Sequence, residues 1–146
     1  MERIRQRIDC FLKDFELLED WPDQCAYLMA IGGRHPLRPF ERSEGNRITG
    51  CQSNAWLHLL PDGQGGVQIS VDSDALVIRG ILGMLAQIWD GESPEAILRT
   101  DMGFLNDMGI YQRVTSSRAT GIRSAIRQIT AFCEKALSAA GKAPLS

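Results

Sequence analysis

Apolar residues at helical spacing dominate the first third of the chain. From residue 4 to residue 18 they recur every three or four positions, which predicts an amphipathic helix with one buried face. Asp20-Trp21-Pro22 then has the form of a cap followed by a proline in the first helical turn. Gly32-Gly33 ends this second helix. Two helices are therefore expected before residue 34.

Helical spacing returns in the second half of the chain. Residues 76–89 are apolar on nearly every side, which indicates a helix that runs through the core. Short helices are expected from Ser93-Pro94 to about Arg99 and from Asp101 to Met108. Thr115 is a suitable N-cap for a long final helix that extends to about residue 137.

Between these helical regions the period of the pattern changes to two, which is typical of strands. Three neighbouring strands are expected, at 46–49, 55–60 and 67–71, with a hairpin turn at Pro61–Gly66. Asp72-Ser73-Asp74 is expected to cap the central helix. The predicted fold class is α+β, a small antiparallel three-stranded sheet with helices packed on one face. The whole chain, residues 1–146, is expected to form a single domain with a frayed tail from about residue 141.

Composition and charge exclude several classes of partner. The 146 residues are 44% hydrophobic and 23% charged, and the net charge of −2 gives no bulk attraction to nucleic acid or to anionic lipid. Arg3, Arg5 and Arg7 alternate with acidic neighbours and are interpreted as a solvated helix face. No apolar run is long enough to span a bilayer, and the N-terminus has no apolar signal core. We therefore expect a cytoplasmic protein with reduced thiols.

Four cysteines occur, and one differs from the others. Cys10 and Cys133 lie in helical apolar patterns and Cys25 near a helix start, where a free cysteine usually behaves as a small hydrophobe. None belongs to a C-x-x-C pair, and no histidine has zinc-finger spacing, so no metal site and no cofactor are expected. Only Cys51 follows a glycine and precedes polar residues, at the expected end of a sheet.

The stretch Gly50-Cys51-Gln52-Ser53 is consistent with several functions. Gly50 frees the backbone before the thiol, and Gln52 and Ser53 supply groups that tie down a loop. Cys51 can be an inert surface cysteine, or the nucleophile of a hydrolase with His35 or His58 as base. It can also be a metal ligand together with Asp74 and a histidine. The fourth possibility is sulfur or redox transfer, which needs an accessible thiol, a sheltering pocket and a partner surface but no base or metal.

Lysine occurs only at positions 13, 135 and 142. Enzymes that release sulfur from cysteine through pyridoxal phosphate need a Schiff-base lysine, and this chain has none in its middle. The sequence therefore favours a protein that receives sulfur over an enzyme that liberates it.

Three motifs, in order, resemble the SufE family of sulfur-acceptor proteins. Gly50-Cys51-Gln52-Ser53-Asn54-Ala55-Trp56 is similar to the family signature G-C-Q-S-x-V-W. Ser73-Asp74-Ala75 with Gly80 resembles its S-D-A-x-x-x-x-G element, and Ser117-Arg118 with Gly121 its S-R-x-x-G element. Trp21 and the Arg34-x-Pro36 stretch extend the resemblance over nearly the whole chain.

The resemblance implies a fold shared with IscU-type scaffold proteins and a function centred on Cys51. This thiol would take a persulfide sulfur from a SufS-type cysteine desulfurase, stimulate that enzyme, and deliver the sulfur to an iron–sulfur assembly scaffold of the SufB type. A monomer or weak homodimer is expected, acting with the desulfurase rather than as a stand-alone enzyme.

The neighbours of Cys51 have alternative roles. By resemblance, Asp74 and Arg118 flank the cysteine loop and influence how it opens or docks, but both can equally act as helix caps or ion-pair partners. Gly50, Gln52 and Ser53 support the loop, and Trp56 is expected in the core. Two alternative functions also stay open: an allosteric partner of a desulfurase that carries no sulfur, and an IscU-like cluster scaffold.

Overall fold

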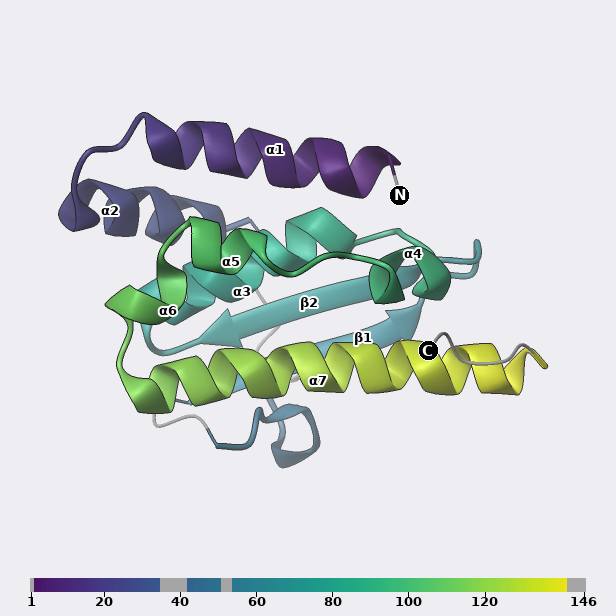
Figure 1. Ribbon diagram of the computed structural model, residues 1–146. Helices are drawn as coiled ribbons and strands as arrows, with labels where there is room; N and C mark the ends of the chain where they lie inside the picture. Colours follow the sequence, from purple (N-terminus) through teal and green to yellow (C-terminus); the bar gives the residue numbers. More distant parts are fainter. Residues whose placement is uncertain (1, 35–41, 51–53, 142–146) are drawn as a thin grey trace.

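The computed structural model describes residues 2–34, 42–50 and 54–141 of the 146-residue chain. Figure 1 shows a small sheet packed against helices. The elements in chain order are α1 (Glu2–Glu16), α2 (Trp21–Gly32), the 3-10 helix η2 (Glu44–Asn46), β1 (Ala55–Pro61), β2 (Val67–Ser73), α3 (Leu76–Trp89), α4 (Pro94–Leu98), α5 (Phe104–Asp107), α6 (Ile110–Arg113) and α7 (Ser116–Ala139). The α+β class predicted from the sequence is confirmed, whereas the expected frayed tail after residue 141 lies outside the described residues.

The sheet consists of β1 and β2, which pair antiparallel from Ala55↔Ser73 to Pro61↔Val67. Asp62 stabilises the turn between them, because its Oδ1 accepts hydrogen bonds from the backbone N–H of Gln64 at 2.7 Å and of Gly66 at 2.9 Å. An aspartate that bonds to backbone N–H groups ahead of it is a common way to close a turn. The predicted hairpin is therefore confirmed.

The third predicted strand, residues 46–49, is wrong for the part of the chain that the structure describes. Arg47 forms only an isolated bridge with Trp56, and the three residues before it form η2. A ladder needs consecutive pairs, but the chain turns at Thr49–Gly50, where Gly50 adopts a left-handed backbone conformation with φ of +79°. The described sheet has two strands for this reason.

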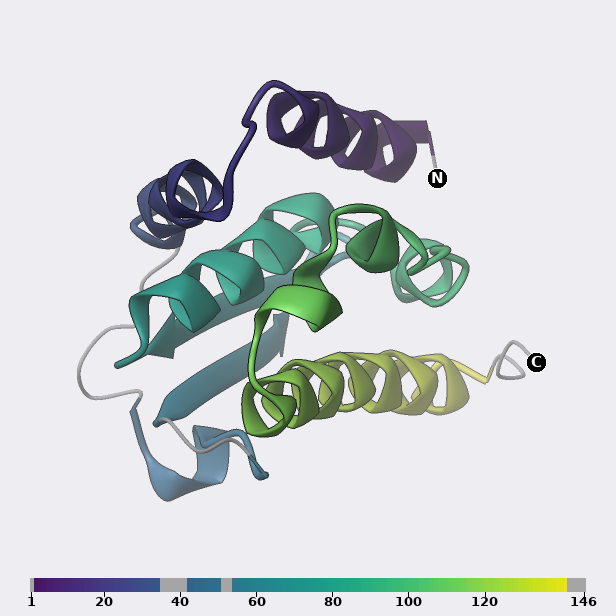
Figure 2. The ribbon, with the colours of Figure 1, turned by 60° about the vertical axis from the view of Figure 1, so that its left-hand side comes forward.

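The helices form a layer on one face of the sheet, as expected. In Figures 1 and 2, α3 and α7 lie along the same side of the two strands, with α1 and α2 farther out beyond α3. The inward positions of β2, namely Val67, Ile69 and Val71, are 1% exposed and belong to the hydrophobic core. The prediction that residues 76–89 run through the core is confirmed, since ten residues of α3 are buried.

Helix α2 approaches α3 closely enough for their backbones to touch. A Cβ placed on Gly80 would lie 2.1 Å from the carbonyl oxygen of Leu28, and one placed on Gly32 would lie 2.9 Å from the backbone nitrogen of Gly80. Only glycine allows such an approach. The Gly80 that closes the S-D-A-x-x-x-x-G motif therefore has a packing function.

Two predicted helix caps and one predicted helix start are confirmed, and one predicted cap is wrong. Asp20, Ser93 and Thr115 each accept a hydrogen bond from the backbone N–H three residues later, at the start of α2, α4 and α7. The N-cap of α3 is Ala75, which has no side chain able to cap. Asp72 and Ser73 instead belong to the end of β2. The helix expected over 101–108 is the shorter α5, and α6 follows it as a separate turn.

The prediction that the N-terminal arginines form a solvated face is also wrong in part. Arg3 Nε and Arg7 Nη1 lie 3.2 and 3.3 Å from Glu92 Oε2, and the Glu92 side chain is only 4% exposed. Arg7 also donates to the carbonyl of Ile88 at 2.9 Å. These contacts attach α1 to the end of α3, whereas Arg5 is exposed along the same helix, as predicted.

Candidate functional site

The described part of the candidate site consists of the residues that border positions 51–53: Thr49 and Gly50 lie next to α7, and Asn54 lies at the end of β2. Cys51, Gln52 and Ser53 themselves lie outside the described residues, so their predicted roles stay predictions. Gly50 and Asn54, which precede and follow them, are described and exposed. β1 begins at Ala55, as predicted, so the segment directly precedes a strand of the sheet.

On the N-terminal side of this segment the chain runs against α7. Gly50 has its positive φ here, and a Cβ on it would lie 3.3 Å from Thr120 Cγ2, so a side chain would be both strained and crowded. The hydroxyls of Thr49 and Ser124 lie 3.5 Å apart, which adds a second approach to the same helix. The prediction that Gly50 is needed for its backbone freedom is consistent with this geometry.

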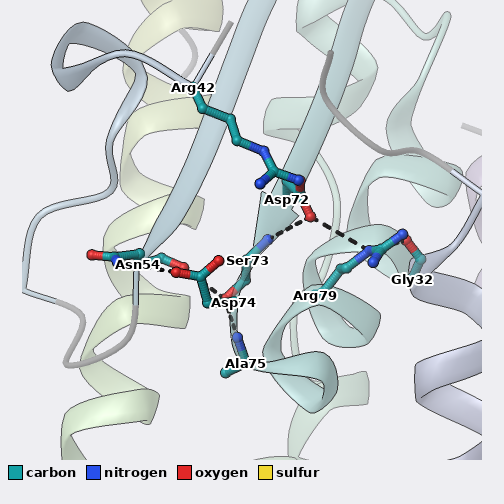
Figure 3. Close-up of polar contacts among 8 residues, drawn as sticks. All are labelled: Gly32, Arg42, Asn54, Asp72, Ser73, Asp74, Ala75 and Arg79. Atoms are coloured by element: carbon teal, nitrogen blue, oxygen red, sulfur yellow. Dashed lines mark hydrogen bonds and ion pairs between the residues drawn. The ribbon is translucent and has the colours of Figure 1, made fainter. Parts of the chain in front are cut away.

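On the C-terminal side, Asn54 is held through both its backbone and its side chain. Its carbonyl oxygen accepts from the N–H of Asp74 at 3.0 Å and from the Ser73 hydroxyl at 2.9 Å. Its side-chain Nδ2 donates to Asp74 Oδ2 at 3.0 Å, and its Oδ1 accepts from Arg47 Nη2 at 2.6 Å. Figure 3 shows Asn54 and Asp74 side by side beyond the end of the strand.

The predicted site residues Asp74 and Arg118 occupy different elements. Asp74 is exposed in the link between β2 and α3, where the Ser73 hydroxyl also accepts from the N–H of Ala75 at 3.1 Å. Arg118 is half-buried in the first turn of α7, where its N–H donates to Thr115 at 3.3 Å. The structure thus brings Asp74 to the C-terminal end of the 51–53 segment. None of these contacts joins Arg118 to Asp74.

A second group of residues, which the sequence did not indicate, lies beside Asn54 on the outer face of the sheet. We call Arg42, Trp56, Asp72 and Arg79 the Asp72 cluster. The Asp72 side chain is 1% exposed and forms ion pairs with Arg42 and Arg79. The distance from Arg79 Nε to Asp72 Oδ1 is 3.4 Å. The same Oδ1 also accepts from the N–H of Ser73 at 2.8 Å (Figure 3). A buried carboxylate normally requires such partners.

The arginines of the Asp72 cluster connect it to the rest of the fold. Arg79 Nε donates to the carbonyl of Gly32 at 2.8 Å, which links α3 to the end of α2. The Arg42 guanidinium lies 5.2 Å from the centroid of the Trp56 ring, within the range of a cation–π interaction. Trp56 is therefore half-buried beneath an arginine rather than in the core, where it was expected.

The other candidate groups are dispersed. His58 is half-buried in β1, and His35 lies outside the described residues. No three side chains of His, Cys, Asp or Glu gather as a metal site within the ranges described. In the same ranges, no helix combines the length and apolar character needed to cross a membrane.

The three described cysteines differ in environment. Cys133 is buried, as expected, and burial raises its pKa to about 11. Cys25 is half-buried, and burial raises its pKa as well, partly offset by the positive charge of Arg113. Cys10 is exposed on α1, so its expected role as a small buried hydrophobe is wrong.

Comparison with known proteins identifies the family to which the chain belongs. Residues 9–133 match the family described as "SufE: Fe-S metabolism associated domain", which confirms the resemblance carried by the three sequence motifs. The fold is similar to the solution structure of a hypothetical protein from Thermus thermophilus, with a TM-score of 0.73 and 26% sequence identity. That similarity covers 90% of this chain and 96% of the other. The chain therefore belongs to the SufE family, whose domain is associated with Fe-S metabolism.

Proposed function

We propose that this protein accepts a persulfide sulfur on Cys51 from a SufS-type cysteine desulfurase, stimulates that enzyme, and passes the sulfur to an iron–sulfur scaffold complex of the SufB type. The observation that carries the proposal is the SufE family match over residues 9–133, which includes position 51. Of the four cysteines, Cys51 is the one within the family-like signature.

The proposed transfer is a thiol exchange in which atoms and electrons balance. The Cys51 thiolate attacks the terminal sulfur of the desulfurase persulfide. One S–S bond forms to Cys51 while the S–S bond to the desulfurase cysteine breaks, and that cysteine leaves as a thiolate. Neither an external oxidant nor a resident cofactor is required. The desulfurase turns over faster because its own cysteine returns to the thiolate form and can accept another sulfur atom.

The geometry around positions 51–53 supports this role. The two described residues that border positions 51–53, Gly50 and Asn54, are both exposed, so a partner protein can reach these two residues. Asn54 is hydrogen-bonded to Ser73, Asp74 and Arg47, so the chain leaves the segment at a fixed place. Functional residues are often found on loops that a rigid scaffold positions in this way.

The test is mass spectrometry after incubation with a SufS-type desulfurase and free cysteine, without reducing agent. We expect the peptide that contains Cys51 to gain the mass of whole sulfur atoms, and the Cys51→Ser variant to gain none and to lose stimulation of the desulfurase. Replacement of Cys10, Cys25 or Cys133 by serine leaves sulfur uptake at Cys51 nearly unchanged. Stimulation that survives Cys51→Ser contradicts the carrier role.

Measurements of sulfur uptake, desulfurase stimulation and iron binding separate the two alternative functions from the proposed one. A purely allosteric partner stimulates the desulfurase but gains no sulfur. A cluster scaffold retains bound iron after anaerobic incubation with desulfurase, cysteine and ferrous iron, which elemental analysis measures. Either result without sulfur on Cys51 overturns the proposal.

A further inference from the structure

A cavity of about 520 Å³ is lined by residues of α1, α2 and α3 and of the turns that follow α2 and α3. Its charged lining residues are Arg7 and Asp14 on α1, Arg34 two residues after α2, and Asp90 directly after α3. Cavities of this size accommodate small organic molecules. The lining carries charges of both signs, and it shares no residue with the candidate site or the Asp72 cluster.

Gln87 of α3 also lines the cavity, and only one end of its side-chain amide is hydrogen-bonded. Arg34 Nη1 donates to Gln87 Oε1 at 3.3 Å. Because a guanidinium has only donors, this bond fixes which end of the amide is the oxygen. The other end, Nε2, is buried and has no hydrogen-bond partner among the described residues. A buried donor left unpaired costs about 1–3 kcal/mol, so Nε2 calls for an acceptor from outside the chain.

A carboxylate is the acceptor that suits this position. Arg34 and Gln87 Nε2 both offer donors, and the guanidinium can hold two carboxylate oxygens in parallel hydrogen bonds. Arg34 is exposed, so its side chain has room to turn toward a ligand and to give access to the amide. Arg7 is less suited, because it already contacts Glu92 at 3.3 Å and donates to the carbonyl of Ile88 at 2.9 Å.

The negative charge in the lining favours a ligand that also has a positive group. Tyr27, on α2, donates its hydroxyl hydrogen to Asp14 Oδ2 at 2.6 Å. Burial and this hydrogen bond raise the pKa of Tyr27, and the positive charge of Arg34 offsets part of the rise, so both charges act on the same phenol. An ammonium group can bind the exposed Asp14 carboxylate, whereas Asp90 already accepts from the N–H of Ile69 at 2.9 Å.

We propose that this cavity binds a small α-amino acid, with the ligand's carboxylate on Arg34 and Gln87 Nε2 and its ammonium group toward Asp14. Phe11, which also lines the cavity, provides an apolar contact for the ligand's side chain. The site is separate from the proposed sulfur transfer and does not depend on it. Because the ligand binds groups on α1, α3 and the turn after α2, it stabilises the folded protein.

The test is isothermal titration calorimetry of the full chain at pH 7 with L-alanine, L-methionine, L-glutamate and L-arginine as probes. We expect at least one of them to bind saturably, with a Kd of about 1 mM or lower. Two derivatives of the tightest probe test the recognition of its charged groups. The amide lacks the carboxylate and the N-acetyl form lacks the positive charge, so each binds at least about tenfold more weakly.

Two substitutions test the residues that recognise the carboxylate. Arg34→Gln removes the guanidinium from an exposed position, and Gln87→Glu replaces the unpaired donor by an oxygen that repels the ligand. We expect each to weaken binding of the tightest probe at least about tenfold. Arg5→Gln, at an exposed position of α1 outside this lining, is the matched control and binds as wild type does. Thermal melts establish that each variant is folded.

Cys10 also lines the cavity and reports where the ligand binds. Saturating amounts of the tightest probe slow alkylation of Cys10 by iodoacetamide at least about threefold, because the ligand covers the thiol. Support requires this protection together with weaker binding by Arg34→Gln and Gln87→Glu. The inference is overturned if none of the four probes binds, if the two folded variants bind as tightly as wild type, if the amide binds as tightly as the free acid, or if Cys10 is not protected.

Discussion

Trp56 and Asp72 are partners across the β1–β2 ladder, so an indole and a fully buried carboxylate share the outer face of the sheet. Arg42 contacts both of them, through a cation–π interaction and an ion pair. Outer positions of a two-layer sheet usually face water. In this protein, Asp72 occupies such a position but is buried, and Arg42 and Arg79 compensate its negative charge.

The first prediction concerns this charge. Asp72→Ala removes a buried carboxylate that accepts hydrogen bonds from charged groups, and because the guanidinium groups of Arg42 and Arg79 that remain are partly exposed to water, the expected cost is about 1–3 kcal/mol. We expect the free energy of unfolding, measured with urea, to fall by roughly this amount. Asp9→Ala, at an exposed position of α1, is the control and changes it by less than about 0.5 kcal/mol. An Asp72→Ala variant as stable as this control would show that the cluster contributes no net stability.

The Asp72 cluster also shows why the sequence predicted only part of the site. The residues Asp72-Ser73-Asp74 before an apolar helical pattern have the composition of an N-cap, and local pattern alone predicts that role. In the structure, Asp72 belongs to the end of β2 and forms ion pairs with Arg42 and Arg79. These arginines are 30 and 7 residues from Asp72 along the chain. Contacts between distant segments have no local signal, so the ion pairs could not be derived.

Elements with a strong local signal were predicted well. The helix over residues 76–89, the hairpin at Pro61–Gly66 and the Thr115 cap each depend on neighbouring residues, and the structure contains all three. The strand expected at 46–49 failed because pairing depends on the partner strand, and Gly50 turns the chain after a single bridge. The motif around Cys51 identified the family, although the position of the thiol lies outside the described residues.

The second prediction concerns the contact between α2 and α3. In Gly80→Ala the new Cβ meets the carbonyl of Leu28, a backbone atom that cannot move aside as a side chain does. Overpacking of this kind costs about 1–3 kcal/mol, and we expect at least the upper part of that range in urea denaturation. Gly33→Ala is the control, since its Cβ would be 3.7 Å from the carbonyl of Ala30, an ordinary contact. Equal stability of the two variants would contradict the close helix approach.

The third prediction concerns the accessibility of the thiols. In a Cys51→Ser background, three cysteines remain, of which Cys10 is exposed, Cys25 half-buried and Cys133 buried. Because the accessible thiolate is the reactive form, we expect iodoacetamide at pH 8 to modify Cys10 at least about tenfold faster than Cys133. Peptide mass mapping over time measures the order. Addition of urea beyond the unfolding transition should remove the difference, and similar rates in the folded protein would contradict the burial of Cys133.

The fourth prediction follows from the same burial and concerns pH. Burial raises the pKa of Cys133 from an ordinary value of 9.0 to about 11, because the folded protein disfavours the thiolate. Below pH 9 the thiol is protonated in both the folded and the unfolded chain, so its contribution to stability is fully present. Between about pH 9 and pH 11 the unfolded chain loses the proton first, and stability falls as the pH rises.

This loss is measurable by comparison with a variant that lacks the thiol. We expect the free energy of unfolding of wild type to decrease between pH 8 and pH 10.5 by about 2 kcal/mol more than that of Cys133→Ala. Tyr27, whose pKa is also raised, mainly by burial and by its hydrogen bond to Asp14, titrates in both proteins and cancels in the difference. The small cavity left by Cys133→Ala lowers stability equally at both pH values. Parallel pH profiles for the two proteins would therefore show that Cys133 is not buried as a neutral thiol.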